Sequence, residues 1–401
     1  MQHFDRTGSV MQVVVQKQWW LKTWLGAGLL WWLVGMLLLP TSKLYQQGVI
    51  LLFWVPGVLA LLSDARVIRA WLQPMSAVLI VFGAWSALSF TWAGVPVAPK
   101  ELKIFLYVLL AANALMALAC IAPVLLWRLL ALSALLVGML AWASLVMFYG
   151  VEGRGFSERA VGTALVNHPI LGAQLFGVMG ILLLYLRRHL PHPLQGGLWF
   201  VALMGYAAIL VLSQSKGPWV AALLVLLISP LWSGQRWQWL LSLGCIVAVA
   251  SLLWAFPELV LQRGFSYRPE LMAQALLKIE SSPWLGLGFG TPYLLPVEAL
   301  HRSYEHAHNI YLHIAVVLGL PGLFAWLLLH GLALIKAWRA RDTGFGRMLC
   351  TLLCFAMLAL FTDGVGPWVK PREEWFCLWL PLFLCMAWGA LQRQDSGQQR
   401  G

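Results

Sequence analysis

A dense group of titratable side chains lies in the stretch HRSYEHAHN, residues 301–309, directly before a long apolar run. Histidine gains and loses a proton near neutral pH, so a histidine here can act as a general base. Zinc binding through His306 and His308 is the alternative, although the H-E-x-x-H spacing of zinc enzymes is missing. His313 lies one turn into the apolar run, where we expect it to pack. The candidate polar residues of this stretch are His301, Arg302, Glu305, His306, His308 and Asn309.

Basic side chains recur in the segments that separate the apolar runs. A guanidinium group matches two phosphate oxygens at once, and several such groups together make a site for a lipid phosphate or diphosphate. Neutralisation by nearby acids and by lipid headgroups is the alternative explanation. The basic residues that we predict on one side of a membrane are Arg154, Arg159, Lys216, Arg263, Arg268, Arg302, Lys370 and Arg372.

Lys216 occurs in SQSKGPW, where one apolar run ends and the next begins almost at once. Gly217 and Pro218 predict a turn there, with Pro218 near the start of the following helix. A helix N-terminus is electropositive and offers free N–H groups, so Ser215 and Lys216 belong to a second candidate site for anions. The alternative is an interfacial lysine that reaches toward the lipid headgroups.

The elements that must position these residues are membrane helices. Charged residues make up 10% of the chain and hydrophobic residues 61%, whereas a soluble domain has about 25% charged residues. Apolar runs of roughly 20 residues recur, and each is long enough to cross a bilayer. The runs are continuous and do not alternate, which argues against a barrel. We therefore predict an all-α polytopic membrane protein.

Twelve spans are predicted, of which the eighth is short and could be partly re-entrant. The first span follows a basic leader without a small-residue cleavage site, so we expect an anchor and not a removed signal peptide. The predicted spans are 20–39, 46–63, 74–93, 102–119, 129–149, 169–186, 197–214, 218–233, 237–256, 309–336, 347–366 and 374–391.

Basic residues predict the orientation, because cytoplasmic segments are enriched in lysine and arginine. With both termini in the cytoplasm, the inner segments hold 15 of the 27 Lys and Arg but only 4 of the 15 Asp and Glu. This asymmetry supports an even number of spans. It also explains the net charge of +12 without nucleic acid, which we exclude as a partner.

The chain divides into residues 1–256 with nine spans, a long outer loop over 257–308, and residues 309–401 with three spans and a cytoplasmic tail. A loop of this length is usually functional or disordered, and its aromatic content argues against disorder. Arg268-Pro269-Glu270 predicts the start of a short helix with an apolar face, which Ser281-Ser282-Pro283 ends. We expect GLGFGTP to form a tight turn and not a nucleotide loop. The predicted apolar face is Leu271, Ala275, Leu276 and Ile279.

These segments resemble the O-antigen ligase and polymerase superfamily, in the family's order, over about residues 150–325. HAHNIYLHIAVVLGLPGL resembles its His-Asn-x-Tyr-Leu segment and the Gly-x-x-Gly helix that follows. SQSKGPW is similar to its Ser-Arg-Gly turn, and RAVGTALVNHPILGA to its Arg-x-x-Gly-Thr loop. RPELMAQALLKIESSPWLGLGFG resembles its Arg-led periplasmic helix with Pro-x-x-Gly-x-Gly. The first 150 residues match in hydropathy alone.

Two positions depart from the family pattern. Lys216 stands where the family usually has arginine, which keeps the charge but loses the planar fork. Val317 stands where many members have glutamate, so a catalytic role for that glutamate is excluded in this chain.

The resemblance implies a GT-C-like glycosyltransferase in the inner membrane of a Gram-negative bacterium, with its active site facing the periplasm. Ligases of this superfamily transfer polysaccharide from undecaprenyl diphosphate to the lipid A-core of lipopolysaccharide. The expected partners are the undecaprenyl-diphosphate-linked O-antigen, lipid A-core and membrane lipids. Polymerases use the same donor, and related members glycosylate protein serines. A non-enzymatic transporter of lipid-linked glycans is a further alternative, but transporters tend to hold their polar sites at the bilayer midplane.

The implied reaction is an inverting displacement without metal or cofactor. His308 takes the proton of the acceptor hydroxyl, while cationic side chains stabilise the leaving diphosphate. We expect Arg268 and Lys216, helped by Arg154 or Arg159, to bind that diphosphate. The possible supporting residues are Ser215, His301, Arg302, Glu305, His306 and Asn309.

Overall fold

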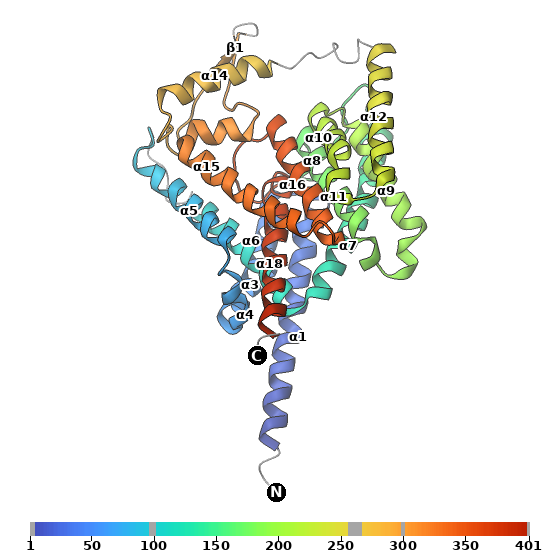
Figure 1. Ribbon diagram of the computed structural model, residues 1–401, viewed down its shortest axis with the longest axis vertical. Helices are drawn as coiled ribbons and strands as arrows, with labels where there is room; N and C mark the ends of the chain where they lie inside the picture. The colour runs from blue at the N-terminus through green and yellow to red at the C-terminus, as the bar shows by residue number, and fades with distance from the viewer. Residues whose placement is uncertain (1–4, 96–101, 256–266, 298–300, 399–401) are drawn as a thin grey trace.

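The computed structural model describes residues 5–95, 102–255, 267–297 and 301–398, and nearly all of its regular structure is helical (Figure 1). Eight helical segments of the described residues are long and apolar enough to cross a membrane. The predicted all-α polytopic membrane fold is confirmed. The predicted loop 257–308 begins outside the described residues, which resume at Tyr267.

Helix occupies the place of each predicted span. α9 and α10 are shorter than the others, with 16 and 13 residues, so the count of twelve spans stays a prediction. The helices at these places are α1 (Asp5–Val34) with η1 (Gly35–Leu37), α2 (Ser42–Val49) with η2 (Ile50–Trp54) and α3 (Val55–Ser63), α5 (Pro74–Leu88) with η3 (Ser89–Thr91), α6 (Leu102–Ile121), α7 (Pro123–Leu145) with η5 (Val146–Val151), α8 (Pro169–Leu186), α9 (Gly197–Leu212), α10 (Lys216–Ile228) with α11 (Pro230–Ser233), α12 (Arg236–Ala255), α15 (Ile310–Arg339), α16 (Gly344–Thr362), and α17 (Trp375–Leu378) with α18 (Leu380–Gln398).

Small residues let the helices approach one another closely. Gly177 of α8 lies against the ring of Phe355 of α16, and Gly138 of α7 lies against Ala202 and Gly205 of α9. The hydrophobic effect does not drive association between helices that are surrounded by lipid. Van der Waals packing at small residues stabilises their contact instead. α8 and α16 consequently pack side by side, and their ends near residues 168 and 363 come together.

α15 is broken at Gly319, which has φ of 68°. The break frees backbone groups that the loop before α15 binds. Leu287 N donates to Val316 O at 2.9 Å, Gly288 N to Val317 O at 2.9 Å, and Leu320 N to Pro283 O at 2.7 Å. A side chain at Gly319 would meet the Trp284 carbonyl. The glycine-rich stretch is thus the turn that we predicted, and it is fitted to the broken helix.

The described part of the predicted outer loop contains α14 (Arg268–Ser281) and a hairpin of β1 (Leu295–Val297) and β2 (Arg302–Tyr304), in which Leu295 pairs with Tyr304. Figure 1 shows both above one end of the bundle. The predicted start and end of α14 are confirmed, and Leu271 and Ala275 are buried. Leu276 is 49% exposed, so its assignment to the apolar face was wrong. α14 packs on α15 and β1 along a narrow face, and residue 276 is turned away from it.

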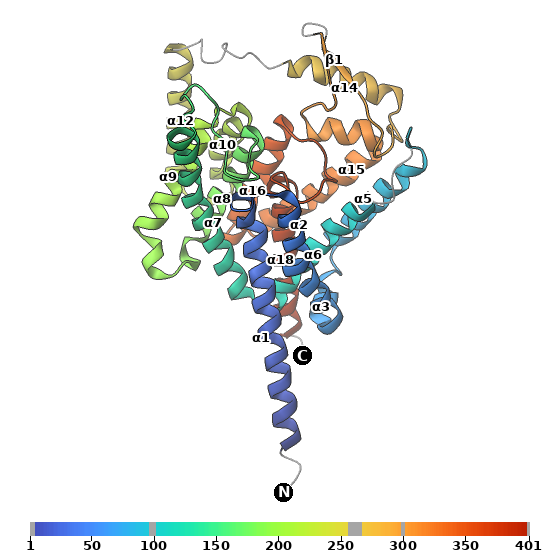
Figure 2. The same ribbon diagram turned by 180° about the vertical axis from the view of Figure 1, so that it is seen from behind.

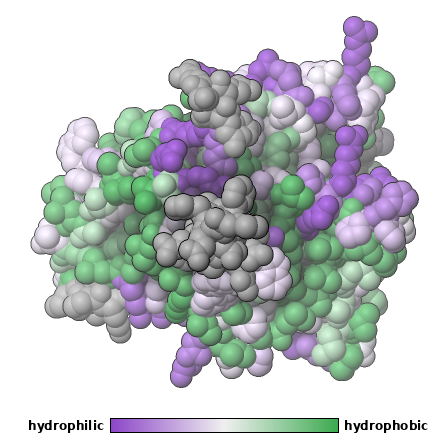
Figure 3. Space-filling view, turned by 90° about the horizontal axis from the view of Figure 1, so that it is seen from below, coloured by the Kyte–Doolittle hydropathy of each residue, from purple (hydrophilic) through white to green (hydrophobic). Residues whose placement is uncertain are grey.

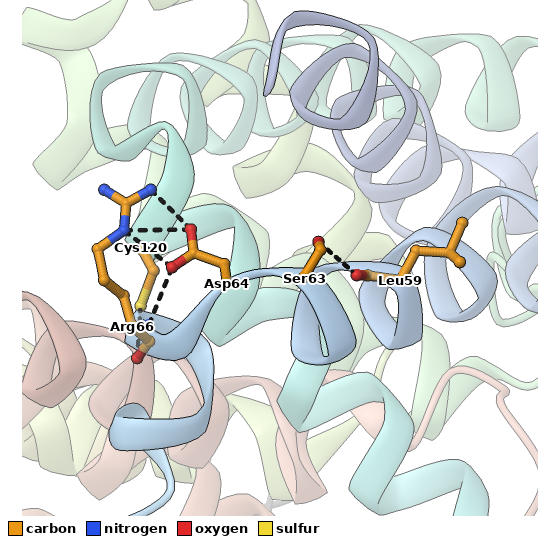
Figure 4. A network of polar contacts seen from close by, with 5 residues as sticks. All are labelled: Leu59, Ser63, Asp64, Arg66 and Cys120. Carbon is orange, nitrogen blue, oxygen red and sulfur yellow. Dashed lines mark hydrogen bonds and ion pairs between the residues drawn. The ribbon is translucent and has the colours of Figure 1, made fainter. Parts of the chain in front are cut away.

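The opposite end of the molecule holds the C-terminal end of α18, and the first part of α1 projects beyond it as a single helix (Figure 2). Seen from below, this end shows hydrophilic patches among hydrophobic side chains (Figure 3). Asp64 caps α4 (Ala65–Ala70) by accepting from Arg66 N at 2.9 Å, and it pairs with the Arg66 guanidinium at 2.7 Å (Figure 4). Asp64 therefore neutralises one of the basic residues at this end.

Candidate active site

His308 and Asp363 form a hydrogen-bonded pair at the end of the bundle that α14 covers. His308 Nδ1 lies 3.0 Å from Asp363 Oδ1, and their side chains are 26% and 4% exposed. Burial alone would raise the pKa of Asp363, but the hydrogen bond and charge of His308 hold it below its ordinary value. An ionised Asp363 accepts a hydrogen bond from Nδ1–H. This leaves Nε2 as the basic nitrogen of a neutral imidazole.

The backbone around His308 fixes the direction of its ring. His308 has φ of 49°, in the left-handed region that non-glycine residues rarely adopt. Asn309 is buried and caps α15, since its Oδ1 accepts from Tyr311 N at 2.9 Å and Leu312 N at 3.2 Å. The cap begins the helix immediately after the strained residue. Asn309 thus has a clear structural role in placing His308.

Two further histidines lie near the pair. The rings of His306 and His308 are 4.2 Å apart. Burial, and next the charge of His308, lowers the pKa of His306 below the ordinary histidine value. Burial also lowers the pKa of His168, which interacts electrostatically with Asp363 and caps α8 by accepting from Leu171 N at 3.3 Å. Burial therefore favours the neutral form of both side chains.

A metal ion is one possible occupant of this cluster. The ligand atoms of His306, His308 and Asp363 all lie within 4.8 Å of one another. Two imidazoles and a carboxylate are a donor set that suits zinc. The same carboxylate also binds His308 directly, so both uses are open to these residues.

Arg268 and Lys216 come from elements that converge on Asp363. Arg268 is the first residue of α14, is half-buried, and interacts electrostatically with Asp363. Lys216 is the first residue of α10, and the neighbouring Gly217 packs against Thr362, which precedes Asp363. The structure has a turn in SQSKGPW, but it lies at Ser213 and Gln214, and the Gly217 and Pro218 that were predicted to form it are already inside α10. Arg268 thus acts electrostatically on Asp363, and the N-terminus of α10 lies against the residue that precedes Asp363.

Arg159 links the loop before α8 to the turn before α10. Its Nε donates to Ser213 O at 3.1 Å and its Nη2 donates to Ser215 Oγ at 2.9 Å. Ser215 Oγ in turn donates to Pro169 O at 2.9 Å, one residue beyond His168. Arg159 also interacts electrostatically with His168. The structure therefore brings Arg159 and Ser215 to the site.

The other predicted residues lie farther out. Arg154 is 50% exposed and pairs with Glu152 at 3.4 Å and Glu158 at 3.2 Å within its own loop. His301, Arg302 and Glu305 are exposed on or beside β2. Glu305 still interacts electrostatically with His306.

Several site residues were missed by the sequence reasoning. Asp363 ends an apolar run and lies within the predicted span 347–366. A carboxylate at that position was a signal, available in the sequence, that the residue is functional. His168 and the acidic pair Glu373 and Glu374 also adjoin the site. Glu374 is fully buried, and neither carboxylate oxygen forms a hydrogen bond, although the Val365 backbone lies close enough to favour the charged form. Burial raises the pKa of Glu374 to about 7.

Comparisons with known proteins identify the family of this chain. A family model described as O-antigen ligase matches residues 199–327, which include Lys216, α14 and His308. The chain is 30% identical over 380 residues to an O-antigen ligase of Pseudomonas aeruginosa strain PAO1, and the match covers 92% of this chain and 91% of that protein. At this identity over nearly the whole of both chains, the protein belongs to the O-antigen ligase family.

Proposed function

We propose that this protein is an O-antigen ligase that transfers polysaccharide from undecaprenyl diphosphate to lipid A-core. The observation that carries the proposal is the His308–Asp363 pair, with its Nδ1–Oδ1 distance of 3.0 Å. It supplies a base for an acceptor hydroxyl, and cations for a diphosphate lie beside it. The family relationship supports the same reaction.

In the proposed reaction, the acceptor hydroxyl oxygen attacks the anomeric carbon of the donor sugar. A C–O bond forms there while the bond from that carbon to the diphosphate oxygen breaks, which inverts the anomeric centre. His308 Nε2 takes the hydroxyl proton. Asp363 stabilises the imidazolium that results and holds the ring in place.

The leaving diphosphate carries the developing negative charge. Arg268, Lys216 and Arg159 are the cations that we assign to it, and the N-termini of α10 and α14 add oriented N–H groups. Fixed charges of this kind need no metal ion, so the proposed mechanism is metal-independent. Arg154 forms ion pairs with Glu152 and Glu158 of its own loop. It therefore has the weakest support among the four predicted diphosphate ligands.

The proposed setting is the inner membrane of a Gram-negative bacterium, with both termini in the cytoplasm. α8 runs from His168 at the site to Leu186 at the other end, so the site lies near one membrane face. The excess of basic residues at the far end supports a periplasmic location for the site. There, residues 267–297 and 301–308 cover the reacting ends of two lipid-anchored substrates, which supplies proximity.

The test is a deletion strain complemented with wild type or with His308→Ala, with gels of lipopolysaccharide and of undecaprenyl-linked glycan. We expect long polymer to accumulate on undecaprenyl diphosphate, with bare core, in the deletion strain and with His308→Ala. Single repeat units on the core would instead identify a polymerase. Absence of periplasmic glycan would identify a transporter. His192, which is exposed at the far end in η7 (His192–Gln195), offers a matched histidine control in His192→Ala.

A further inference from the structure

A polar cavity lies at the end of the bundle opposite His308. Its volume is about 520 Å³, within the range of small-ligand sites. The C-terminal end of α8, η6 (Arg187–His189), the turn between α11 and α12, and the start of α16 line it. α8 has 18 residues and is about 27 Å long. The cavity is therefore separated from the candidate active site by roughly the thickness of a bilayer core.

The lining of this cavity is basic. Arg187, Arg188, His189 and Arg347 contribute to it, and among the described lining residues there is no aspartate or glutamate. Arg128 also lies close enough to His189 to interact electrostatically. Basic residues are common at the cytoplasmic ends of spans, but here they come from separate helices and converge on one hollow.

Backbone carbonyls hold two of these guanidinium groups without neutralising them. Arg347 Nη1 donates to Ser233 O at 3.3 Å and its Nε donates to Thr343 O at 3.3 Å. Arg187 Nε donates to Gln195 O at 2.8 Å, and its guanidinium lies over the Trp199 ring at 4.5 Å. The Arg347 charge is thus preorganised beside Ser233 in the lining, which lowers the entropic cost of binding an anion, whereas the partners of the Arg187 guanidinium lie outside the lining.

The rest of the described lining is uncharged. Leu184, Leu186 and Met348 add apolar surface beside the basic residues. The lining therefore offers cations for a phosphate and an apolar wall for acyl or glycerol carbons.

We propose that this cavity binds the phosphate of an anionic phospholipid in the leaflet opposite the active site. Guanidinium groups bind phosphate oxygens bidentately, and basic pockets between membrane helices select anionic headgroups. The site is independent of the proposed transfer reaction.

The test uses the purified full-length protein in detergent, with its Tm measured against added short-chain phosphatidylglycerol, short-chain phosphatidylcholine or inorganic phosphate. We expect phosphatidylglycerol to raise the Tm. Arg188→Gln should weaken this effect by about fivefold in lipid concentration, the loss typical of one surface cation. Arg339→Gln is the matched control, because Arg339 ends α15 at the same face and is not part of the cavity lining.

The other outcomes are equally decisive. Equal stabilisation by inorganic phosphate would keep the phosphate site but identify a soluble phosphate compound as its ligand. Equal stabilisation by phosphatidylcholine, or an unchanged response in both Arg188→Gln and the double variant Arg188→Gln/Arg347→Gln, would overturn the proposal. If the double variant does not fold, Arg188→Gln alone decides, since Arg188 is exposed.

Discussion

His308 and Asp363 are 55 positions apart in the chain, and their Nδ1 and Oδ1 atoms are 3.0 Å apart. One precedes α15 and the other follows α16, so the antiparallel packing of these two helices assembles the pair. A buried carboxylate that holds a histidine in this way fixes which ring nitrogen is basic. The geometry gives the candidate base a partner whose removal can be tested.

Asp363→Asn should lower the rate of glycan transfer by about 10²–10⁴-fold, because the imidazole loses its orientation and its stabilising charge. The rate is measured with purified donor and acceptor. In the double variant with His308→Ala, the loss should be no larger than in His308→Ala alone. Additive losses would show that the two residues act separately.

Arg268→Gln should raise the donor concentration needed for half-maximal rate, because a cation facing the diphosphate is lost. Arg268→Lys should recover part of the effect, since it keeps the charge without the fork. Lys278→Gln is the matched control, because Lys278 lies in the last turn of the same helix. An equal effect of the two glutamine variants would remove Arg268 from donor binding.

Removal of metal ions by a chelator distinguishes metal binding by the histidine cluster from metal-independent proton transfer by His308. We expect the purified enzyme to keep its transfer rate after dialysis against EDTA, because Arg268, Lys216 and Arg159 are assigned to the charge of the leaving group. A loss of activity that zinc restores would show instead that His306, His308 and Asp363 hold a metal ion.

Gly319→Ala should destabilise the protein by about 1–3 kcal/mol, because the left-handed backbone and the nearby Trp284 carbonyl both oppose a side chain. The measurement is the Tm in detergent. Gly331→Ala is the control within the same helix, since nothing lies within 4 Å of the added carbon. That variant should be neutral or slightly stabilising, by up to about 1 kcal/mol. Equal Tm values for the two variants would contradict the importance of the break.

Glu374→Gln should stabilise the protein at alkaline but not at acidic pH. The folded protein keeps a proton on Glu374 up to about pH 7, whereas the unfolded chain releases it near 4.5. Stability therefore falls as the pH rises from 4.5 to 7, and the full penalty remains above 7. The Tm difference between variant and wild type should grow from pH 5 to 8 and reflect up to about 3 kcal/mol.

The neighbouring acid is the control for this effect. Glu373 lies 3.1 Å from the Arg372 guanidinium and is 3% exposed. Glu373→Gln should lower the Tm at pH 7, because it removes the partner of the Arg372 cation. A pH-independent Tm difference for Glu374→Gln would show that Glu374 is charged throughout.

Local patterns predicted the elements well but the site only in part. Apolar runs indicated the helices, and Arg268-Pro269-Glu270 indicated the start of α14, because both signals depend on neighbouring residues. His308 could be predicted for the same reason, because it is part of a dense polar stretch. Asp363 was not, because it is a single carboxylate at the end of an apolar run. Its role depends on the packing of α16 beside α15.

The exposure of Leu276 and the pairing of Arg154 have a similar origin. The helical period places Leu276 next to Ala275, but the face of α14 that is covered is narrower than the apolar stripe. Arg154 has the charge of a phosphate ligand, yet the acids two residues before it and four residues after it lie within reach. In both cases the sequence allows either outcome, and the tertiary surroundings determine whether the side chain is buried or paired.

The break at Gly319 has a consequence for how the protein is made. A membrane helix with unsatisfied backbone groups is costly in lipid, and the partners of these groups in α15 lie in residues 283–288, before the helix in the chain. In the proposed orientation, residues 283–288 must cross the bilayer before α15 can leave the insertion machinery with its backbone groups satisfied. Translocation of one segment and release of the next into lipid are therefore a single coupled step of biosynthesis.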